Sequence, residues 1–276
     1  MQAAALTDPA RSCGRGHYPS DRPGMTDPSD DRNRMPSRVQ SHLQSHLQSY
    51  GRKRGRPLRA GRKKLVAELL PAIEIAPPSH GPLDLAAAWG GQKDGQPRET
   101  WLEIGFGAGE HLAWQAARHP DIGVIGAEVY EAGIGVLLSA IDRERLGNIR
   151  ICPGDAVALL EALPEASIAR AFVLFPDPWP KRRHWKRRFV SEAGLKRLAR
   201  VLADGAELRL ATDDPSYLVW MLQHIVASPD FAWTPRGARD WLERPDDWPE
   251  TRYEAKAVRE GRRPSYLSLR RRARDG

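Results

Sequence analysis

The sequence predicts an α/β fold in which a mostly parallel sheet carries helices on both faces. Two observations support this prediction. From about residue 98 to residue 228, short apolar runs alternate with longer segments of helical composition, the pattern of repeated strand–helix units. The first apolar run ends in a cluster of glycines and four later ones are followed by acidic residues, as expected where a ligand binds at the carboxyl edge of such a sheet.

The elements follow one another in strict alternation. The predicted strands are 100–104, 122–128, 148–152, 168–175 and 206–212. The predicted helices are 110–119, 130–146, 156–163, 189–202 and 215–228. An alternating segment, 265–270, predicts a last strand at the edge of the sheet. Before the sheet, 62–75 predicts a short amphipathic helix ending near Pro71, and 76–98 predicts a loop.

The composition excludes several classes of protein. The 276 residues are 41% hydrophobic, and no run approaches the roughly 18 to 20 apolar residues of a membrane helix. The first residues lack the basic start and apolar run of a signal peptide, so we expect a cytoplasmic protein. Two cysteines, Cys13 and Cys152, lack metal-ligand spacing, and no metal is expected.

The charge is distributed unevenly. The net charge is +8, and residues 1–64 hold 14 of the 43 basic residues but only 5 of the 35 acidic ones. This excess predicts a polyanionic partner, nucleic acid first and a membrane surface second. We expect a disordered basic tail over 1–50 and a basic arm with a short helix and loop over 51–97. A folded domain with a basic C-terminal end is expected over 98–276.

A glycine-rich turn closes the first predicted strand. Gly105, Gly107 and Gly109 allow a tight turn and a close approach of a ligand to the backbone. A dinucleotide fingerprint needs glycine at the sixth position of this motif, where the chain has Glu110. Because an acid there would repel a pyrophosphate, the turn favours S-adenosylmethionine over NAD. A plain strand–helix turn is the alternative.

Acidic residues follow the second and third predicted strands. Glu128 is expected to accept hydrogen bonds from both hydroxyls of a ribose, as acids do in nucleoside-binding α/β folds. Asp155 is placed to meet an adenine amino group, to cap the next helix, or to do both. A surface acid is the alternative for Glu128, and a helix cap is favoured for Asp155 taken alone.

The segment 173–188 is the most specific part of the sequence. Three prolines restrict the backbone around Asp177 at the end of the fourth predicted strand. Six of the eight residues 181–188 are Lys or Arg, and His184 and Trp185 lie among them. Cations that bind phosphates and rings that stack on bases favour nucleic acid as the partner. The alternative is a solvated loop with its tryptophans in the core.

Two later motifs complete the pattern. Asp213 and Asp214 stand at the end of the fifth predicted strand, on the same edge of the sheet. This acidic pair is expected either to accept hydrogen bonds from a base or to cap the next helix. Residues 251–254 precede a C-terminal end with seven arginines between 259 and 274. A loop and a solvated end are the alternative for this region.

Together these motifs resemble the bacterial tRNA (guanine-N7)-methyltransferase family. The resemblance spans about residues 50–272 and rests on LEIGFGAGEHL, GAEVYEAG, FPDPWPKRRHWKRRFV, ATDD and TRYE. It implies the Rossmann-like class I methyltransferase fold, S-adenosyl-L-methionine as methyl donor and tRNA as substrate. The implied reaction methylates N7 of the guanine at position 46 in the variable loop and forms 7-methylguanosine.

The resemblance also implies a role for each matched residue. Asp177 is implied as the catalytic residue. Cofactor binding is implied for Glu103, Gly105, Gly107, Gly109, Glu128, Asp155 and Asp177. Substrate contacts are implied for Lys181, Asp213, Thr251, Arg252, Tyr253 and Glu254. RNA contacts are implied for Arg183, His184, Trp185, Lys186, Arg187 and Arg188. The late motif departs from the family at Tyr253, where Phe is usual, and lacks a glycine soon after Glu254.

Three other functions fit parts of the pattern. A methyltransferase for another RNA base or for a protein would share the cofactor acids but leaves the 181–188 cluster unexplained. A non-catalytic RNA-binding module does not need Glu103, the glycines or Glu128. An NAD-dependent enzyme is disfavoured by the glycine spacing. A monomer and a homodimer both remain open, and no membrane partner is expected.

Overall fold

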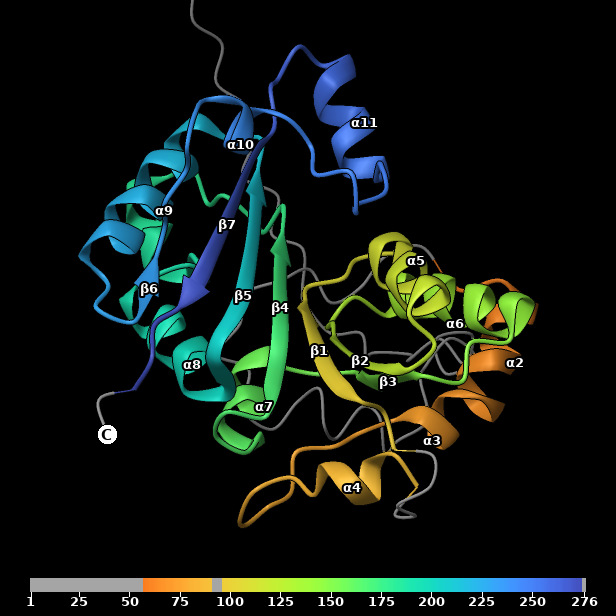
Figure 1. Ribbon diagram of the computed structural model, residues 1–276. Helices are drawn as coiled ribbons and strands as arrows, with labels where there is room; N and C mark the ends of the chain where they lie inside the picture. The colour runs from red at the N-terminus through yellow and green to blue at the C-terminus, as the bar shows by residue number, and fades with distance from the viewer. Residues whose placement is uncertain (1–56, 91–95, 275–276) are drawn as a thin grey trace, which may run out of the picture. The chain divides into compact units, whose positions relative to one another are not determined.

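The protein is described by a computed structural model that covers residues 57–90 and 96–274. Its centre is a seven-stranded sheet in the order β3-β2-β1-β4-β5-β7-β6 (Figure 1). The strands are β1 (Glu99–Ile104), β2 (Ile122–Ala127), β3 (Ile149–Cys152), β4 (Ile168–Leu174), β5 (Leu202–Thr212), β6 (Phe231–Ala232) and β7 (Ser265–Arg271). The first five pair in parallel, whereas β7 pairs antiparallel with β5 and β6. The predicted sheet is therefore confirmed.

Three helices precede the first strand: α2 (Ala60–Glu68), α3 (Leu70–Ile73) and α4 (Leu85–Ala88). The helices between the strands are α5 (Glu110–Arg118), α6 (Glu131–Glu144), α7 (Ala156–Ala162), the 3₁₀ helix η2 (Arg182–Arg187), α8 (Glu192–Val201), α9 (Pro215–Ala227), α10 (Arg239–Leu242) and α11 (Arg252–Arg259). Among the described residues, no helix is both long enough and apolar enough to cross a membrane. The predicted tail over 1–50 lies outside the described residues, and so does the basic stretch from 51 to 56.

Different helices cover the two faces of the sheet. Alternate residues of a strand point to opposite faces, so Leu102 and Ile104 of β1 belong to one core cluster and Trp101 to the other. The first cluster packs against α7, α8 and α9, and the second against α2, α3, α5 and α6. Figure 1 shows α2, α5 and α6 gathered beside β1 to β3. Helices on both faces were predicted, and the structure confirms them.

The strand order places the functional residues. From β1 the chain moves outward through β2 and β3, then returns to add β4 and β5 on the other side of β1. Because the direction of winding reverses between β1 and β4, the loops after these two strands diverge. A crevice results at the carboxyl edge, where the glycine turn and the Asp177 segment begin.

The N-terminal arm differs from our prediction. We expected the packed body to begin near Arg98 and one helix over 62–75 to end at Pro71. Two helices occupy this stretch, and Pro71 lies in the first turn of α3, where a proline loses no helical hydrogen bond. Val66 and Leu70 are buried in the core cluster under α5 and α6, so this arm packs as part of the body.

Several other boundaries also differ. The predicted loop 76–98 contains α4, and the predicted helix 189–202 begins only at Glu192, while β5 already begins at Leu202. The last strand, β7, is not at the edge of the sheet, because the two-residue β6 pairs along its outer side. Residues 252–259, expected as a loop, form α11, because Thr251 accepts a hydrogen bond from the Glu254 amide as a helix cap.

A glycine in α6 gives a test of this packing. A Cβ on Gly133 would overlap the carbonyl oxygen of Gly107, which belongs to the backbone and cannot rotate away. We expect Gly133→Ala to cost about 2 kcal/mol and to lower Tm by about 4 to 8 °C in thermal unfolding. Gly147→Ala is the matched control, because a Cβ there meets nothing within 4 Å. Equal melting temperatures for the two variants would contradict the packing described.

Candidate active site

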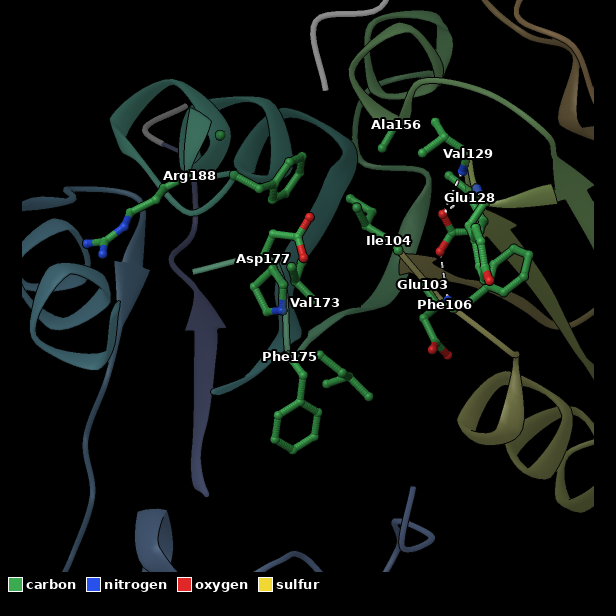
Figure 2. Close-up of a pocket in the computed structure, with 18 of the residues that line it drawn as sticks. Glu103, Ile104, Phe106, Glu128, Val129, Ala156, Val173, Phe175, Asp177 and Arg188 are labelled. Carbon is green, nitrogen blue, oxygen red and sulfur yellow. Dashed lines mark hydrogen bonds between the residues drawn. The ribbon is translucent and has the colours of Figure 1, made fainter. Parts of the chain in front are cut away.

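A cavity of about 770 Å³ occupies the crevice at the carboxyl edge. This volume lies in the usual range for sites that hold small molecules. The glycine turn, the end of β2, the start of α7, the segment from β4 to α8 and the start of α11 form its walls. Figure 2 shows Glu103 and Glu128 on one side and Asp177 opposite them. The structure thus brings together three of the acids that the sequence predicted for cofactor binding.

Glu128 joins the ends of β1 and β2. One carboxylate oxygen accepts the Gly107 amide at 2.7 Å, and the other accepts the amides of Val129 and Tyr130 at 2.7 and 2.8 Å. Burial raises the pKa of the Glu128 carboxyl above its usual range, although the three amide hydrogen bonds act in the opposite direction. Glu128 therefore presents a desolvated carboxylate in the cavity, with its orientation held by the backbone.

Glu103 has a buried partner that the sequence analysis missed. Its carboxylate lies 2.7 Å from Nδ1 of His111, which is in the first turn of α5. On the far side of the ring, Gln115 approaches Nε2 of His111 at 3.1 Å and donates to the Asp247 carbonyl at 2.9 Å. The His111 ring therefore connects Glu103 to Gln115 and, through Gln115, to the backbone of Asp247. A histidine in the first turn of the helix after the glycines was the available signal.

The three glycines of the turn have different tasks. All three have positive φ, between 58° and 74°, which glycine adopts most readily. Gly105 and Gly107 line the cavity, and a Cβ on Gly107 would lie 3.0 Å from the Tyr253 ring. Gly109 does not line it, and a Cβ there would collide with Leu137 of α6. The structure therefore gives Gly109 a packing role rather than the implied cofactor contact.

Asp155 serves as a helix cap. Its carboxylate accepts the Val157 amide at 2.9 Å at the start of α7, and its side chain is buried. Its neighbours Gly154 and Ala156 line the cavity, whereas Asp155 itself does not. The capping interpretation is confirmed, and Asp155 acts by placing the start of α7 against the cavity.

Asp177 lies at the mouth of the cavity on a constrained turn. Phe175 and Trp179, on either side of it, have φ of 49° and 44°, a conformation that costs non-glycine residues energy. Although the residue is exposed, the protein around its carboxyl removes water and raises the pKa of Asp177 above the usual range. Its position suits a group that contacts both a cofactor inside and a substrate outside.

The side chains of the basic run, residues 181–188, point in different directions. Lys186, Arg187 and Arg188 line the cavity, while Lys181 and Arg183 are exposed outside it. The tryptophans are partly buried, with Arg187 stacked 4.9 Å from the Trp179 ring and Arg182 stacked 5.4 Å from the Trp185 ring. His184 lies edge-on to Trp179 at 5.8 Å, and desolvation, followed by the neighbouring cations, lowers its pKa.

Arg188 is the exception in this run and contradicts our prediction of an RNA contact. Its relative exposure is only 2%, and its guanidinium donates to the Pro178 carbonyl at 2.7 Å. Figure 2 shows this guanidinium directed away from the Asp177 carboxylate. A buried side chain with these partners cannot reach RNA without local unfolding.

The late motif closes one wall of the cavity. Thr251 and Tyr253 line it, and Tyr253 is 52% exposed. Glu110 holds this segment to the glycine turn, because it accepts the Arg252 amide at 2.9 Å and forms an ion pair with the Arg252 side chain. The sequence predicts only that Glu110 repels a pyrophosphate and does not indicate this contact with Arg252.

Two implied substrate residues face other partners. Glu254 is buried, accepts the Tyr266 hydroxyl at 2.6 Å and pairs with Arg244 at 3.4 Å, so it is not part of the cavity wall. Asp213 pairs with Arg262 at 3.0 Å and also does not line the cavity. Within the described ranges, no group of three or more His, Cys, Asp or Glu side chains is arranged to hold a metal ion.

The fold and this site are those of a Rossmann-like methyltransferase, and residues 97–266 match a family model described as a putative methyltransferase. The chain is 51% identical over 232 residues to the tRNA (guanine-N(7)-)-methyltransferase of Rhodospirillum rubrum, covering 81% of this chain and 88% of the relative. The enzyme of the same name from Brucella anthropi is 46% identical, with 80% and 94% covered. That from Ruegeria pomeroyi is 47% identical, with 80% and 93% covered. The chain belongs to the tRNA (guanine-N(7)-)-methyltransferase family, as its motifs indicated.

Removal of the Glu128 carboxylate tests the cofactor site. We expect Glu128→Ala to raise the Kd for S-adenosylmethionine about tenfold or more in calorimetry, because hydrogen bonds to a charged group are worth about 1.5 to 3 kcal/mol. Glu128→Gln keeps one acceptor oxygen and should lose less. Glu144→Ala, at the exposed end of α6, is the matched control. A wild-type Kd for S-adenosylmethionine in both Glu128 variants would show that Glu128 does not bind the cofactor.

Proposed function

We propose that this protein transfers a methyl group from S-adenosyl-L-methionine to N7 of a guanine in tRNA, at position 46 of the variable loop. Its relatives are named for guanine-N7 methylation of tRNA. The observation that carries the proposal is a single cavity lined both by the acids Glu128 and Asp177 and by the basic Lys186 and Arg187. A cationic nucleoside and a polyanionic RNA can therefore meet in one site.

The lining residues fit S-adenosylmethionine. This cofactor has a positive sulfonium and no phosphate, so the carboxylates of Glu103 and Glu128 suit it better than they suit a pyrophosphate. We expect Glu128 to accept a hydrogen bond from a ribose hydroxyl, and Ala156 and Val157 offer an apolar wall for adenine. When bound there, the cofactor supplies an electrophilic methyl group.

The task of the protein is alignment rather than proton transfer. Guanine N7 has a free lone pair and no proton, so its attack needs no strong base, only correct placement. Asp177 at the mouth can accept hydrogen bonds from guanine N1–H and the amino group, and its charge stabilises the cation that methylation creates. Asp213 is less suited to this task, because it is paired with Arg262 and lies outside the cavity wall.

The exposed cations around the cavity suit the rest of the tRNA. Lys181, Arg183 and Lys186 project from the segment that follows Asp177 and can bind phosphates on either side of the target nucleotide. Because such contacts release counterions, binding should weaken as salt rises. A tRNA substrate also places the protein in the cytoplasm.

Replacement of Asp177 tests the reaction and the site together. We expect Asp177→Ala to reduce methylation of unmodified tRNA by at least about 10²-fold, since it removes the charge that stabilises the product cation. The assay incubates protein, labelled S-adenosylmethionine and tRNA, and then measures 7-methylguanosine after digestion to nucleosides. Far-ultraviolet circular dichroism controls for folding. A near-normal rate would exclude Asp177 as the catalytic residue, and label in another nucleoside or in protein would favour another methyltransferase.

The acid limb of the pH profile gives an independent test. Asp177 must be ionised to accept the guanine protons, so activity falls as pH drops through its pKa. Desolvation raises the pKa of Asp177 above 3.8. We therefore expect the acidic decline of kcat/KM to begin at a higher pH than it would for an ordinary aspartate. Glu128 shifts in the same direction, so the Kd for the cofactor is measured across the same pH range to separate the two. Constant activity down to about pH 4 would contradict this assignment.

A further inference from the structure

Arg188 is a buried residue of the cavity wall that connects two loops of the site. Its Nε donates to the Pro178 carbonyl at 2.7 Å, directly after Asp177 in the chain. On the other side, its Nη2 donates to the Ser216 hydroxyl at 2.9 Å and Nη1 to the Ser216 carbonyl at 3.4 Å. One guanidinium therefore joins the turn after β4 to the first turn of α9, which follows β5.

The surroundings of this cation are aromatic rather than acidic. The Trp185 and Tyr217 rings lie 4.9 Å from the centre of the guanidinium, and the Trp220 ring lies 5.3 Å from it. In the described part of the chain, no carboxylate is within ion-pair distance of Arg188. Asp214 is connected to it indirectly, because the Ser216 hydroxyl that accepts from Arg188 donates to Asp214 at 2.7 Å. The charge is thus held by cation–π contacts and by directional hydrogen bonds.

The turn that Arg188 contacts needs external support. Trp179 has a left-handed φ of 44°, and Phe175 has one of 49°. Such conformations cost about 1 kcal/mol or more each and persist only when contacts around them hold the backbone in place. The hydrogen bond to the Pro178 carbonyl lies between these two residues, next to the peptide that carries Asp177.

We propose that Arg188 is a positioning residue for methyl transfer, which holds the Asp177 turn in its reactive arrangement and does not contact RNA. This inference rests on the proposed function and deepens it. The neighbouring basic residues of the run serve the RNA, while Arg188 acts only through Asp177. Lysine cannot replace it, because an ammonium group lacks the planar fork that bonds both loops and stacks between rings.

The test separates turnover from RNA affinity. We expect Arg188→Lys to lower kcat for tRNA methylation by about 10- to 100-fold, since a small misplacement of a catalytic group is enough for such a loss. The KM for tRNA should stay within about twofold, and its dependence on salt should not change. Arg183→Ala is the comparison variant for RNA binding. Loss of an exposed phosphate contact should raise the KM for tRNA and should reduce the slope of log affinity against log salt concentration by about one. Arg143→Lys is the matched control, because Arg143 is exposed on α6 and this substitution should leave kcat and KM unchanged.

A second variant guards against misfolding. Ser216→Ala removes one acceptor of Arg188 and leaves the rings in place, so kcat should fall less, again without a change in KM. An increased KM and a weaker salt dependence in Arg188→Lys would overturn the inference and make Arg188 an RNA contact. Full kcat in Ser216→Ala together with a parallel loss of Tm and cofactor affinity in Arg188→Lys would also overturn it and leave a purely structural role. Wild-type protein that forms no 7-methylguanosine would instead contradict the proposed function.

Discussion

A buried carboxylate at the carboxyl edge of the sheet organises this site. Glu128 directly follows β2 and accepts the Gly107 amide at 2.7 Å, which ties the glycine turn after β1 to the neighbouring strand. The turn can approach so closely because its glycines adopt positive φ and carry no side chain. Burial of an acid costs free energy, and here three backbone amides offset part of that cost. The position of the cavity, of α5 and of α11 follows from this turn.

A chain of polar contacts connects the end of β1 to the C-terminal part of the protein. Glu103 contacts His111, and Gln115 continues from His111 to the backbone of Asp247. The Asp247 carboxylate in turn pairs with Arg209 of β5 at 2.7 Å. Together with the contact between Glu110 and Arg252, this chain holds α11 over the glycine turn. The wall of the cavity at the start of α11 is thus attached to the glycine turn and to α5.

Neighbouring residues of one basic run serve different purposes because of packing. Arg187 and Arg188 both line the cavity, but Arg187 stacks on Trp179, whereas Arg188 is buried with its guanidinium among Trp185, Tyr217 and Trp220. Both are arginines in the same cluster, so residue type alone cannot distinguish them. The distinction arises where the chain leaves η2, after which Arg188 turns inward toward the start of α9.

The sequence by itself determined the alternation of strands and helices, the glycine turn and the acids after the strands, because these depend on local periodicity and on the chemistry of each residue type. Only the tertiary structure decided which of these side chains share a cavity. Asp155 and Gly109 turned out to be a cap and a packing contact, and Glu254 faces Tyr266. Such roles depend on contacts between segments far apart in the chain, as between Glu110 and Arg252. Local sequence patterns do not predict these contacts.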